Sequence, residues 1–160
     1  MKSPRRYYDS LYEVAAAVNS ARTPEDVLLT LVEDTAKALD AKGCSILLLT
    51  PDKKCLIHTA AHGLSDRYIR KGLIALDPGI VNALEGKPVA VFDAILDKRT
   101  KYGEAEEREG IKAIISVPMM LREKAIGVIR VYKAEEYQFT EDEMHFVCLV
   151  ANLGAIALEN

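Results

Sequence analysis

This chain of 160 residues has few of the residue types that mark disulfide, metal or haem proteins. It contains no tryptophan, three cysteines and three histidines. An odd number of cysteines without a Cys-x-x-Cys pair points to reduced thiols and predicts a cytoplasmic protein. No apolar run approaches the roughly 20 residues of a membrane-spanning helix. The basic N-terminus lacks the apolar core of a signal peptide.

Strong charge of one sign is also missing. The formal net charge is -3, with both signs interspersed, and no stripe of Lys and Arg is present. Binding to nucleic acid through counterion release is therefore not expected. Hydrophobic residues make up 49% of the chain, enough for one buried core, and no repeat or linker interrupts it. We therefore expect one domain over residues 1–160.

Apolar spacing and capping residues predict two N-terminal helices. The first covers residues 5–20, with an apolar stripe that includes Tyr8, Leu11 and Tyr12. Thr23 is a cap followed by Pro24, and a second helix then runs to about Leu39.

The pattern then changes to that of strands. Two apolar runs flank a turn at 51–54 and predict a hairpin. Ser65 and Asp77 each cap a short helix. The polar segment 93–110 lacks periodicity and is expected to be a functional lid or a mobile loop. The predicted strands cover residues 44–50, 55–62, 88–92, 112–118 and 125–132. Pro118 should lie at a strand end or edge.

The last helix opens with a capping box, Thr140 to Glu143, and is apolar almost all round. Its polar residues His145, Asn152 and Glu159 recur every seven residues. A sheet covers only one face of such a helix, so the other face should meet another helix, either the first one or that of a partner chain.

His58 and His62 form a His-x-x-x-His pair that would suit a shared metal on a helix. The preceding turn, Thr59 and Gly63 favour a strand instead. On a strand the two side chains share one face but stand roughly 13 Å apart, at about 3.3 Å per residue. We therefore predict no metal site.

The order of motifs resembles that of the GAF domain family. The C-terminal half, "GIKAIISVPMMLREKAIGVIRVY" followed by "YQFTEDEMHFVCLVANLGAIALEN", carries the resemblance. The segment "TPEDVLLTLVEDTAKALDAKGCSILLL" is similar to the family's second helix and first strand. The resemblance implies an α+β, profilin-like fold, with a central antiparallel sheet, terminal helices on one face and a pocket of loops and short helices on the other.

Several ligand classes of the family find weak support here. Haem-binding relatives supply a histidine from the region 93–110, which has none, and the Cys55-Leu-Ile-His58 stretch does not match a bilin attachment site. Cyclic-nucleotide binders carry Asn-Lys…Phe…Asp-Glu. This chain has Tyr132-Lys133, Phe139 and Asp142-Glu143, so that class stays open. No cofactor is expected.

The family also includes free methionine sulfoxide reductases, which use cysteines around the pocket. Cys44 and Cys55 start adjacent hairpin strands, some 20 Å apart along the strand, beyond the ~7 Å reach of a disulfide. Cys148 lies on the last helix. We therefore predict three thiols without a catalytic role, and keep an enzyme of this kind as an alternative.

By resemblance, the expected function is a non-catalytic sensory domain. It binds a small molecule, forms a homodimer through its first and last helices, and signals to a downstream domain or protein. A purely structural dimerisation module is the other alternative. The candidate ligand contacts are His62, Tyr68, Asp93, Tyr102 and Ser116.

Overall fold

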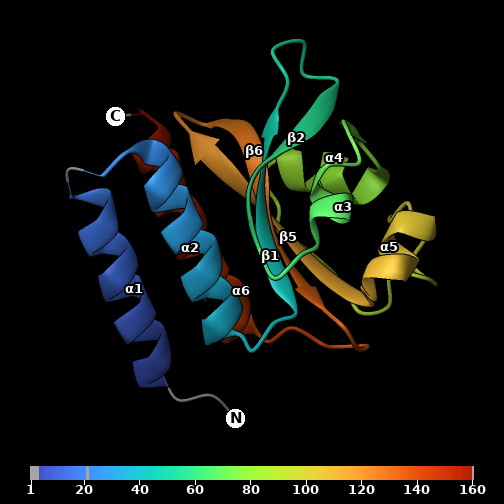
Figure 1. Cartoon of the computed structure of the whole chain (residues 1–160), viewed down its shortest axis with the longest axis horizontal. Helices are drawn as coiled ribbons and strands as arrows, with labels where there is room; N and C mark the ends of the chain where they lie inside the picture. Colours follow the sequence, from blue (N-terminus) through green and yellow to red (C-terminus); the bar gives the residue numbers. More distant parts are fainter. Residues whose placement is uncertain (1–3, 21, 160) are drawn as a thin grey trace.

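The computed structural model describes residues 4–20 and 22–159 as an α+β fold (Figure 1). The predicted domain limits, 1 and 160, lie outside the described residues. The elements are α1 (Pro4–Val18), α2 (Pro24–Ala38), β1 (Gly43–Leu49), β2 (Cys55–His62), α3 (Asp66–Ile69), β3 (Ile74–Ala75), α4 (Pro78–Leu84), β4 (Val89–Val91), α5 (Glu104–Glu109), β5 (Ala113–Leu121), β6 (Lys124–Lys133) and α6 (Glu141–Glu159).

The strands form one antiparallel sheet in the order β3-β2-β1-β6-β5-β4. On one face, α2 and α6 contact the sheet and α1 packs on both of them. On the other face lie the short helices α3, α4 and α5 (Figure 1). We call these the helical face and the cavity face. The predicted architecture is confirmed.

Alternation along the strands builds a separate apolar core on each face. The core of the helical face includes Ile46, Ile129 and Val131, together with Leu31 of α2 and Val147 of α6. The core of the cavity face is smaller and includes Leu47, Ile114, Val128 and Tyr132. Strands β1, β5 and β6 contribute to both cores, so they fix the two layers relative to each other.

The capping residues begin their helices as predicted. The Thr23 hydroxyl accepts from the amide of Asp26 (3.2 Å), and Ser65 and Asp77 cap α3 and α4. At α6 the box is reciprocal: Glu143 N–H donates to Thr140 Oγ1 (3.0 Å) and Thr140 N–H to Glu143 Oε1 (2.9 Å). Local chemistry alone therefore located these helix starts.

The predicted stripe of α1 is partly wrong. Tyr8 and Tyr12 are exposed, at 72% and 77%. Val14 is buried instead, and the Tyr7 ring stacks on Phe146 of α6 with centroids 5.0 Å apart. The helix is rotated from the expected orientation because its apolar residues could define more than one face. The second face of α6 is covered by α1 and α2, which confirms that it meets another helix.

The segment 93–110 was expected to be irregular throughout, but it contains the helix α5. This helix has no apolar stripe, and its ends are fixed by polar groups. The Gly103 N–H donates to Glu106 Oε1 (2.9 Å), and Gly110 ends the helix in the left-handed region (φ 75°). Since apolar periodicity was the signal used, it could not reveal such a helix.

A bulge in β2 separates the two histidines. Ile46 pairs with Ala60 but Leu47 pairs with His58, so Thr59 is an extra residue. His58 therefore shares the cavity face with Leu47, whereas His62 lies on the helical face beside Cys44. The prediction that both histidines share a face is wrong, because the bulge reverses the alternation.

Pro118 lies within β5, opposite Val128 of β6. On the other side, β4 pairs only with residues 114–116 of β5, so at Pro118 the strand is an edge. A missing N–H is tolerated there, which agrees with the expected edge position.

Among the described residues, no helix has both the length and the apolar character to cross a membrane.

The contact between α1 and α2 contains a carboxyl group in an unfavourable setting. Burial, and then hydrogen bonding and repulsion with Glu13 of α1, raise the pKa of Asp34 from 3.8 to about 6. Repulsion from Glu33 adds to this shift, and attraction to Lys37 opposes it. The folded state thus binds this proton more tightly than the unfolded chain, so stability falls as the pH rises from about 4 through about 6.

We expect Asp34→Asn to remove this loss of stability. Urea unfolding should show a higher midpoint than wild type at pH 7.5 and a smaller difference at pH 5, because Asn carries no charge at either pH. The control is Asp9→Asn, the same change at an exposed residue of α1. It should leave the pH dependence of the unfolding midpoint as it is in the wild type. A midpoint for Asp34→Asn below wild type at pH 7.5 would contradict this account.

Candidate functional site

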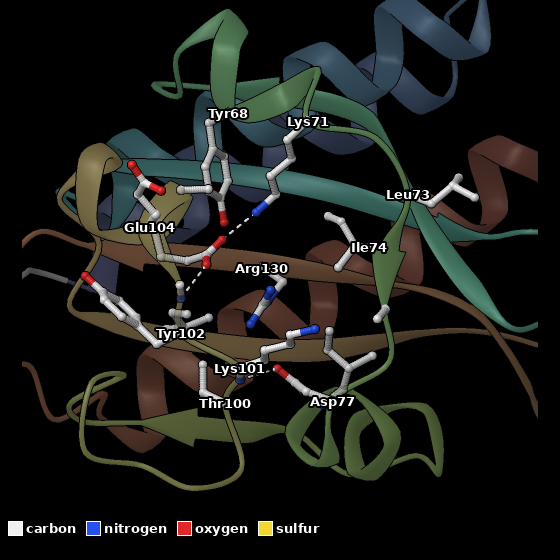
Figure 2. A pocket seen from close by; sticks show the side chains of 16 residues that line it. Tyr68, Lys71, Leu73, Ile74, Asp77, Thr100, Lys101, Tyr102, Glu104 and Arg130 are labelled. Carbon is white, nitrogen blue, oxygen red and sulfur yellow. Dashed lines mark hydrogen bonds and ion pairs between the residues drawn. The ribbon is translucent and has the colours of Figure 1, made fainter.

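A cavity of about 350 Å³ lies between the cavity face of the sheet and the segments that cover it (Figure 2). Its size is at the lower end of the range for small-molecule sites. It is lined by Tyr68, Lys71, Leu73, Ile74, Ala75, Asp77, Ile80, Thr100, Lys101, Tyr102, Gly103, Glu104, Ala105, Glu106, Ile114 and Arg130. Aliphatic side chains, two tyrosines and six charged groups thus face one space.

The floor of the cavity is part of the sheet and carries Arg130 of β6. Register pairs Arg130 with Ser45 of β1 on one side and Ser116 of β5 on the other, so a polar row crosses three strands. Arg130 is 7% exposed, and its Nε donates to Ser116 Oγ (3.0 Å). Its guanidinium points into the centre of the cavity (Figure 2).

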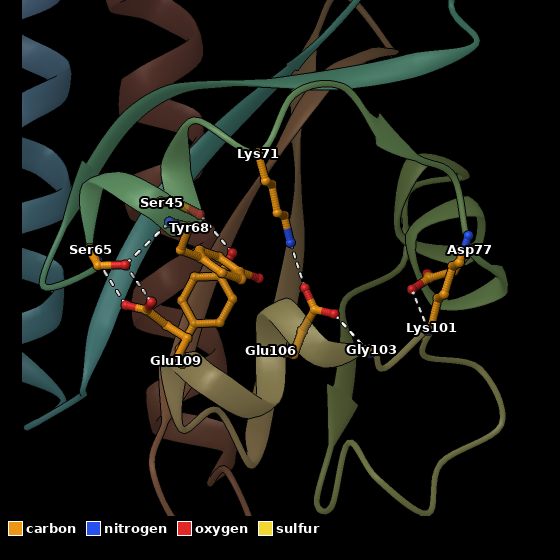
Figure 3. Close-up of polar contacts among 10 residues, drawn as sticks. Ser45, Ser65, Tyr68, Lys71, Asp77, Lys101, Gly103, Glu106 and Glu109 are labelled. Atoms are coloured by element: carbon orange, nitrogen blue, oxygen red, sulfur yellow. Dashed lines mark hydrogen bonds and ion pairs between the residues drawn. The ribbon is translucent and has the colours of Figure 1, made fainter.

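One wall is formed by α3, the residues that follow it and α5. An ion pair between Lys71, just after α3, and Glu106 of α5 joins them. Lys71 Nζ lies 2.5 Å from Glu106 Oε2 and 3.8 Å from the centroid of the Tyr68 ring (Figure 3). Burial alone would raise the pKa of Glu106, but hydrogen bonds from Lys71 and the Gly103 N–H lower it below its usual value. Glu106 is therefore an ionised and fully engaged carboxylate.

The opposite wall is organised by Asp77, the cap of α4. Its Oδ1 accepts from the Ile80 N–H (2.8 Å) and its Oδ2 from the Lys101 N–H (3.0 Å). The second bond ties the segment 100–103 to α4. In the same segment, the Tyr102 hydroxyl donates to the carbonyl of Ile111 (2.9 Å). Backbone groups therefore hold this wall in place and occupy both oxygens of Asp77.

His58 lies behind the Tyr68 ring, with centroids 5.7 Å apart. Burial, followed by the positive charges of Lys71 and Arg130, lowers the pKa of His58 to about 4. The imidazole is thus neutral near pH 7. Neither of its ring nitrogens has a hydrogen-bond partner among the described residues.

The structure brings two of the five candidate residues to the cavity, Tyr68 and Tyr102. Ser116 lies beneath it as the acceptor for Arg130. Asp93 accepts from the Ile95 N–H (3.0 Å) in the turn after β4 and does not line the cavity. His62 lies on the helical face, so its expected place at the pocket rim is wrong.

Sequence reasoning missed Arg130, Lys71 and Glu106. For Arg130 a signal existed, since it is a charged residue inside the apolar run 125–132. Lys71 and Glu106 gave none, because their pairing joins positions 35 residues apart.

Metal and thiol chemistry have little support in this geometry. Within the described ranges, no group of three or more His, Cys, Asp or Glu side chains could hold a metal ion. No cysteine lines the cavity. Cys44 is buried on the helical face, and that burial raises the pKa of its thiol far above the usual range.

We call α3, α5 and the segment 100–103, which lie over the cavity, the cover. A second carboxylate, Glu109 of α5, joins α5 to the start of α3. It accepts from the Ser65 N–H (2.7 Å) and the Ser65 hydroxyl (2.6 Å) (Figure 3). Burial would raise its pKa, but these two bonds lower it. Ala105 is the residue of α5 that packs against the apolar core, so this bridge should contribute strongly to holding the helix in place.

We expect Glu109→Ala to loosen the cover without unfolding the sheet. Bonds to an ionised group are typically worth about 1.5–3 kcal/mol, so amide exchange in 104–109 should rise roughly 10-fold or more, as measured by hydrogen–deuterium exchange. Glu107→Ala, an exposed change on the same helix, is the matched control. Equal exchange in the two variants would contradict the role of this bridge.

Residues 21–159 match the family model described as GAF domain. The phosphoenolpyruvate-dependent phosphotransferase system proteins of Escherichia coli (strain K12) and Salmonella typhimurium are each 32% identical over 149 residues. These matches cover 91% of this chain and 20% of each relative, so the chain spans about a fifth of their length.

Solved structures share the fold. The GAF domain of a phosphoenolpyruvate-protein phosphotransferase from Coxiella burnetii superimposes with a TM-score of 0.85 at 20% identity, covering 97% of this chain and 94% of that one. Free methionine-R-sulfoxide reductase from Neisseria meningitidis, bound to its substrate, gives 0.80 at 16% identity, with coverages of 99% and 93%. Identities this low show the fold alone. With the family match over residues 21–159, the predicted resemblance is confirmed: the chain belongs to the GAF domain family.

Proposed function

We propose that this domain is a non-catalytic sensory module that binds a small molecule in the cavity and transmits its occupancy through the terminal helices. The observation that carries the proposal is the cavity itself. It combines aliphatic walls with convergent polar groups, the composition typical of small-molecule sites. A purely structural module would gain nothing from a charged arginine buried beneath such a space.

The relatives suggest the setting of this module. The matched curated proteins belong to the phosphoenolpyruvate-dependent phosphotransferase system, and this chain corresponds to about a fifth of each. We infer that the domain serves as a regulatory input to a downstream phosphotransferase or signalling protein. Catalysis by the domain itself, as in methionine sulfoxide reduction, is disfavoured because its cysteines do not line the cavity.

Signalling would proceed by a population shift. The cover, formed by α3, α5 and the segment 100–103, faces across the cavity Ile114 of β5 and Arg130 of β6. The opposite face of β5 contacts α6. There Gly154 allows close packing, since an added Cβ would lie 2.9 Å from the Met119 side chain. A ligand that favours the closed cover would thus favour one arrangement of β5 against α6.

We expect at least one class of small metabolites to stabilise the domain saturably in a thermal-shift screen of nucleotides, amino acids and small carboxylates. A ligand at a hundredfold excess over Kd adds about 2.7 kcal/mol, which raises Tm by roughly 5–10 °C for a domain of this size. Ala75→Trp should abolish the shift by narrowing the cavity, whereas Ala16→Trp on α1 should keep it. A screen without any saturable shift would count against the sensory role.

We further propose that the domain forms a homodimer through α1 and α6, in parallel or antiparallel orientation. Its support is the set of large apolar side chains that these helices expose. Tyr8 and Tyr12 of α1 are 72% and 77% exposed, and Leu149 and Ile156 of α6 are 50% and 48% exposed. Burial of such side chains contributes about 1.5–3 kcal/mol each.

Light scattering at micromolar concentration should give twice the mass of the chain. Leu149→Glu should give the monomer mass with an unchanged circular dichroism spectrum, because the side chain lies outside the core. Leu96→Glu makes the same change at a residue that is 77% exposed in the loop after β4, and it should remain dimeric. A monomeric wild-type chain would overturn the dimer.

A further inference from the structure

We propose that the cavity takes a small carboxylate, whose anionic group pairs with the guanidinium of Arg130 on the cavity floor. This inference rests on the proposed ligand-binding function and names the chemical class of the ligand. The observation behind it is a buried, charged side chain that points into the cavity without a counter-ion.

The guanidinium of Arg130 is poorly satisfied by the protein. It has five N–H donors, and its single hydrogen bond to a described residue runs from Nε to Ser116 Oγ. No carboxylate of the described residues forms an ion pair with it, although the side chain is only 7% exposed. An uncompensated buried charge typically costs several kcal/mol, so an anion entering the cavity would gain a strong interaction.

The acidic groups that share the cavity are committed elsewhere. Glu106 receives Lys71 and the Gly103 N–H, and Asp77 receives two backbone N–H groups. Glu104 is bonded to Arg108, on the same helix. Each carboxylate that lines the cavity thus has hydrogen-bond partners of its own, and none of them forms an ion pair with Arg130.

The charge balance favours a monoanionic group over a phosphate. The lining contains three cations, Lys71, Lys101 and Arg130, and three carboxylates. A single added negative charge matches the one unpaired guanidinium, whereas a dianion would meet repulsion from the surrounding carboxylates. His58 adds no positive charge, because it is neutral near pH 7. The planar carboxylate also matches the fork of the guanidinium.

Further polar groups on the walls, Thr100, Tyr102 and Lys101, could bind the remainder of the ligand. The aliphatic side chains of Ile74, Ile80 and Ile114 also line the cavity and can contact a short carbon chain. A short-chain acid with a second polar end therefore fits the walls better than a long or purely apolar acid.

The test uses the full chain and compares succinamate, a monoanion with a neutral amide end, with succinamide, its neutral diamide, and with inorganic phosphate. Calorimetry of the wild type should show saturable binding of succinamate, and at least 10-fold weaker binding of succinamide and phosphate. Arg130→Met should lower the affinity for succinamate roughly 10-fold or more, as expected for bonds to a charged group, with Arg130→Lys between the two. Arg122→Gln, at the exposed β5–β6 turn, is the control and should bind as wild type does.

Stability of the ligand-free variants gives a second readout. Because Arg130 is buried without a counter-ion, Arg130→Met should unfold at the same temperature as wild type or higher. A structural arginine would give the opposite result. A marked loss of Tm in Arg130→Met would therefore overturn the inference, whatever the binding data show.

The remaining outcomes separate the two proposals. If succinamide or phosphate binds as tightly as succinamate, or if Arg130→Met keeps full affinity for succinamate, the carboxylate assignment fails and the sensory function stands. If no compound of any charge stabilises the wild type, either here or in the broader screen, the sensory function fails and the inference fails with it.

Discussion

Strand β6 contributes side chains to the apolar cores on both faces of the sheet, and the rest of the structure depends on this shared strand. Ile129 and Val131 pack in the core of the helical face, while Val128, Arg130 and Tyr132 lie on the cavity face. The strand lies between β1 and β5, so each of its residues has neighbours on both sides. Strands β5 and β6 thus lie between the cavity and α6, which contacts both of them.

The two faces are built from different kinds of interaction. The helical face is an extensive apolar core in which α2 and α6 pack directly on the strands. The cavity face has a smaller apolar core, which includes Tyr68 of α3, and hydrogen bonds and one ion pair join α3 and the residues near it to α5. Elements with few buried apolar contacts open more easily than a packed core. The cover is therefore expected to open more easily than the helices on the other face.

Arg130 is a charged residue on the floor of the cavity with little support from the sheet. The sheet supplies one acceptor, Ser116, and the Tyr132 ring lies 5.7 Å from the guanidinium carbon. A hydrophobic residue would pack at least as well at this position. The two serines beside Arg130, Ser45 and Ser116, form a polar row within an otherwise apolar surface, which is consistent with a position kept for binding.

The sequence by itself determined the elements whose signals are local. Capping residues located four helix starts, apolar runs bounded by turns located the main strands, and the order of motifs pointed to the GAF family. It also identified Tyr68 and Tyr102 as cavity residues. Tertiary structure alone decided the rest, because those features depend on contacts between distant segments. The Thr59 bulge is defined only by its partner strand, and it moves His62 to the helical face. Helix α5 is fixed by polar contacts rather than by an apolar stripe, and the placement of Arg130 at the cavity floor requires the pairing of β6 with β1 and β5.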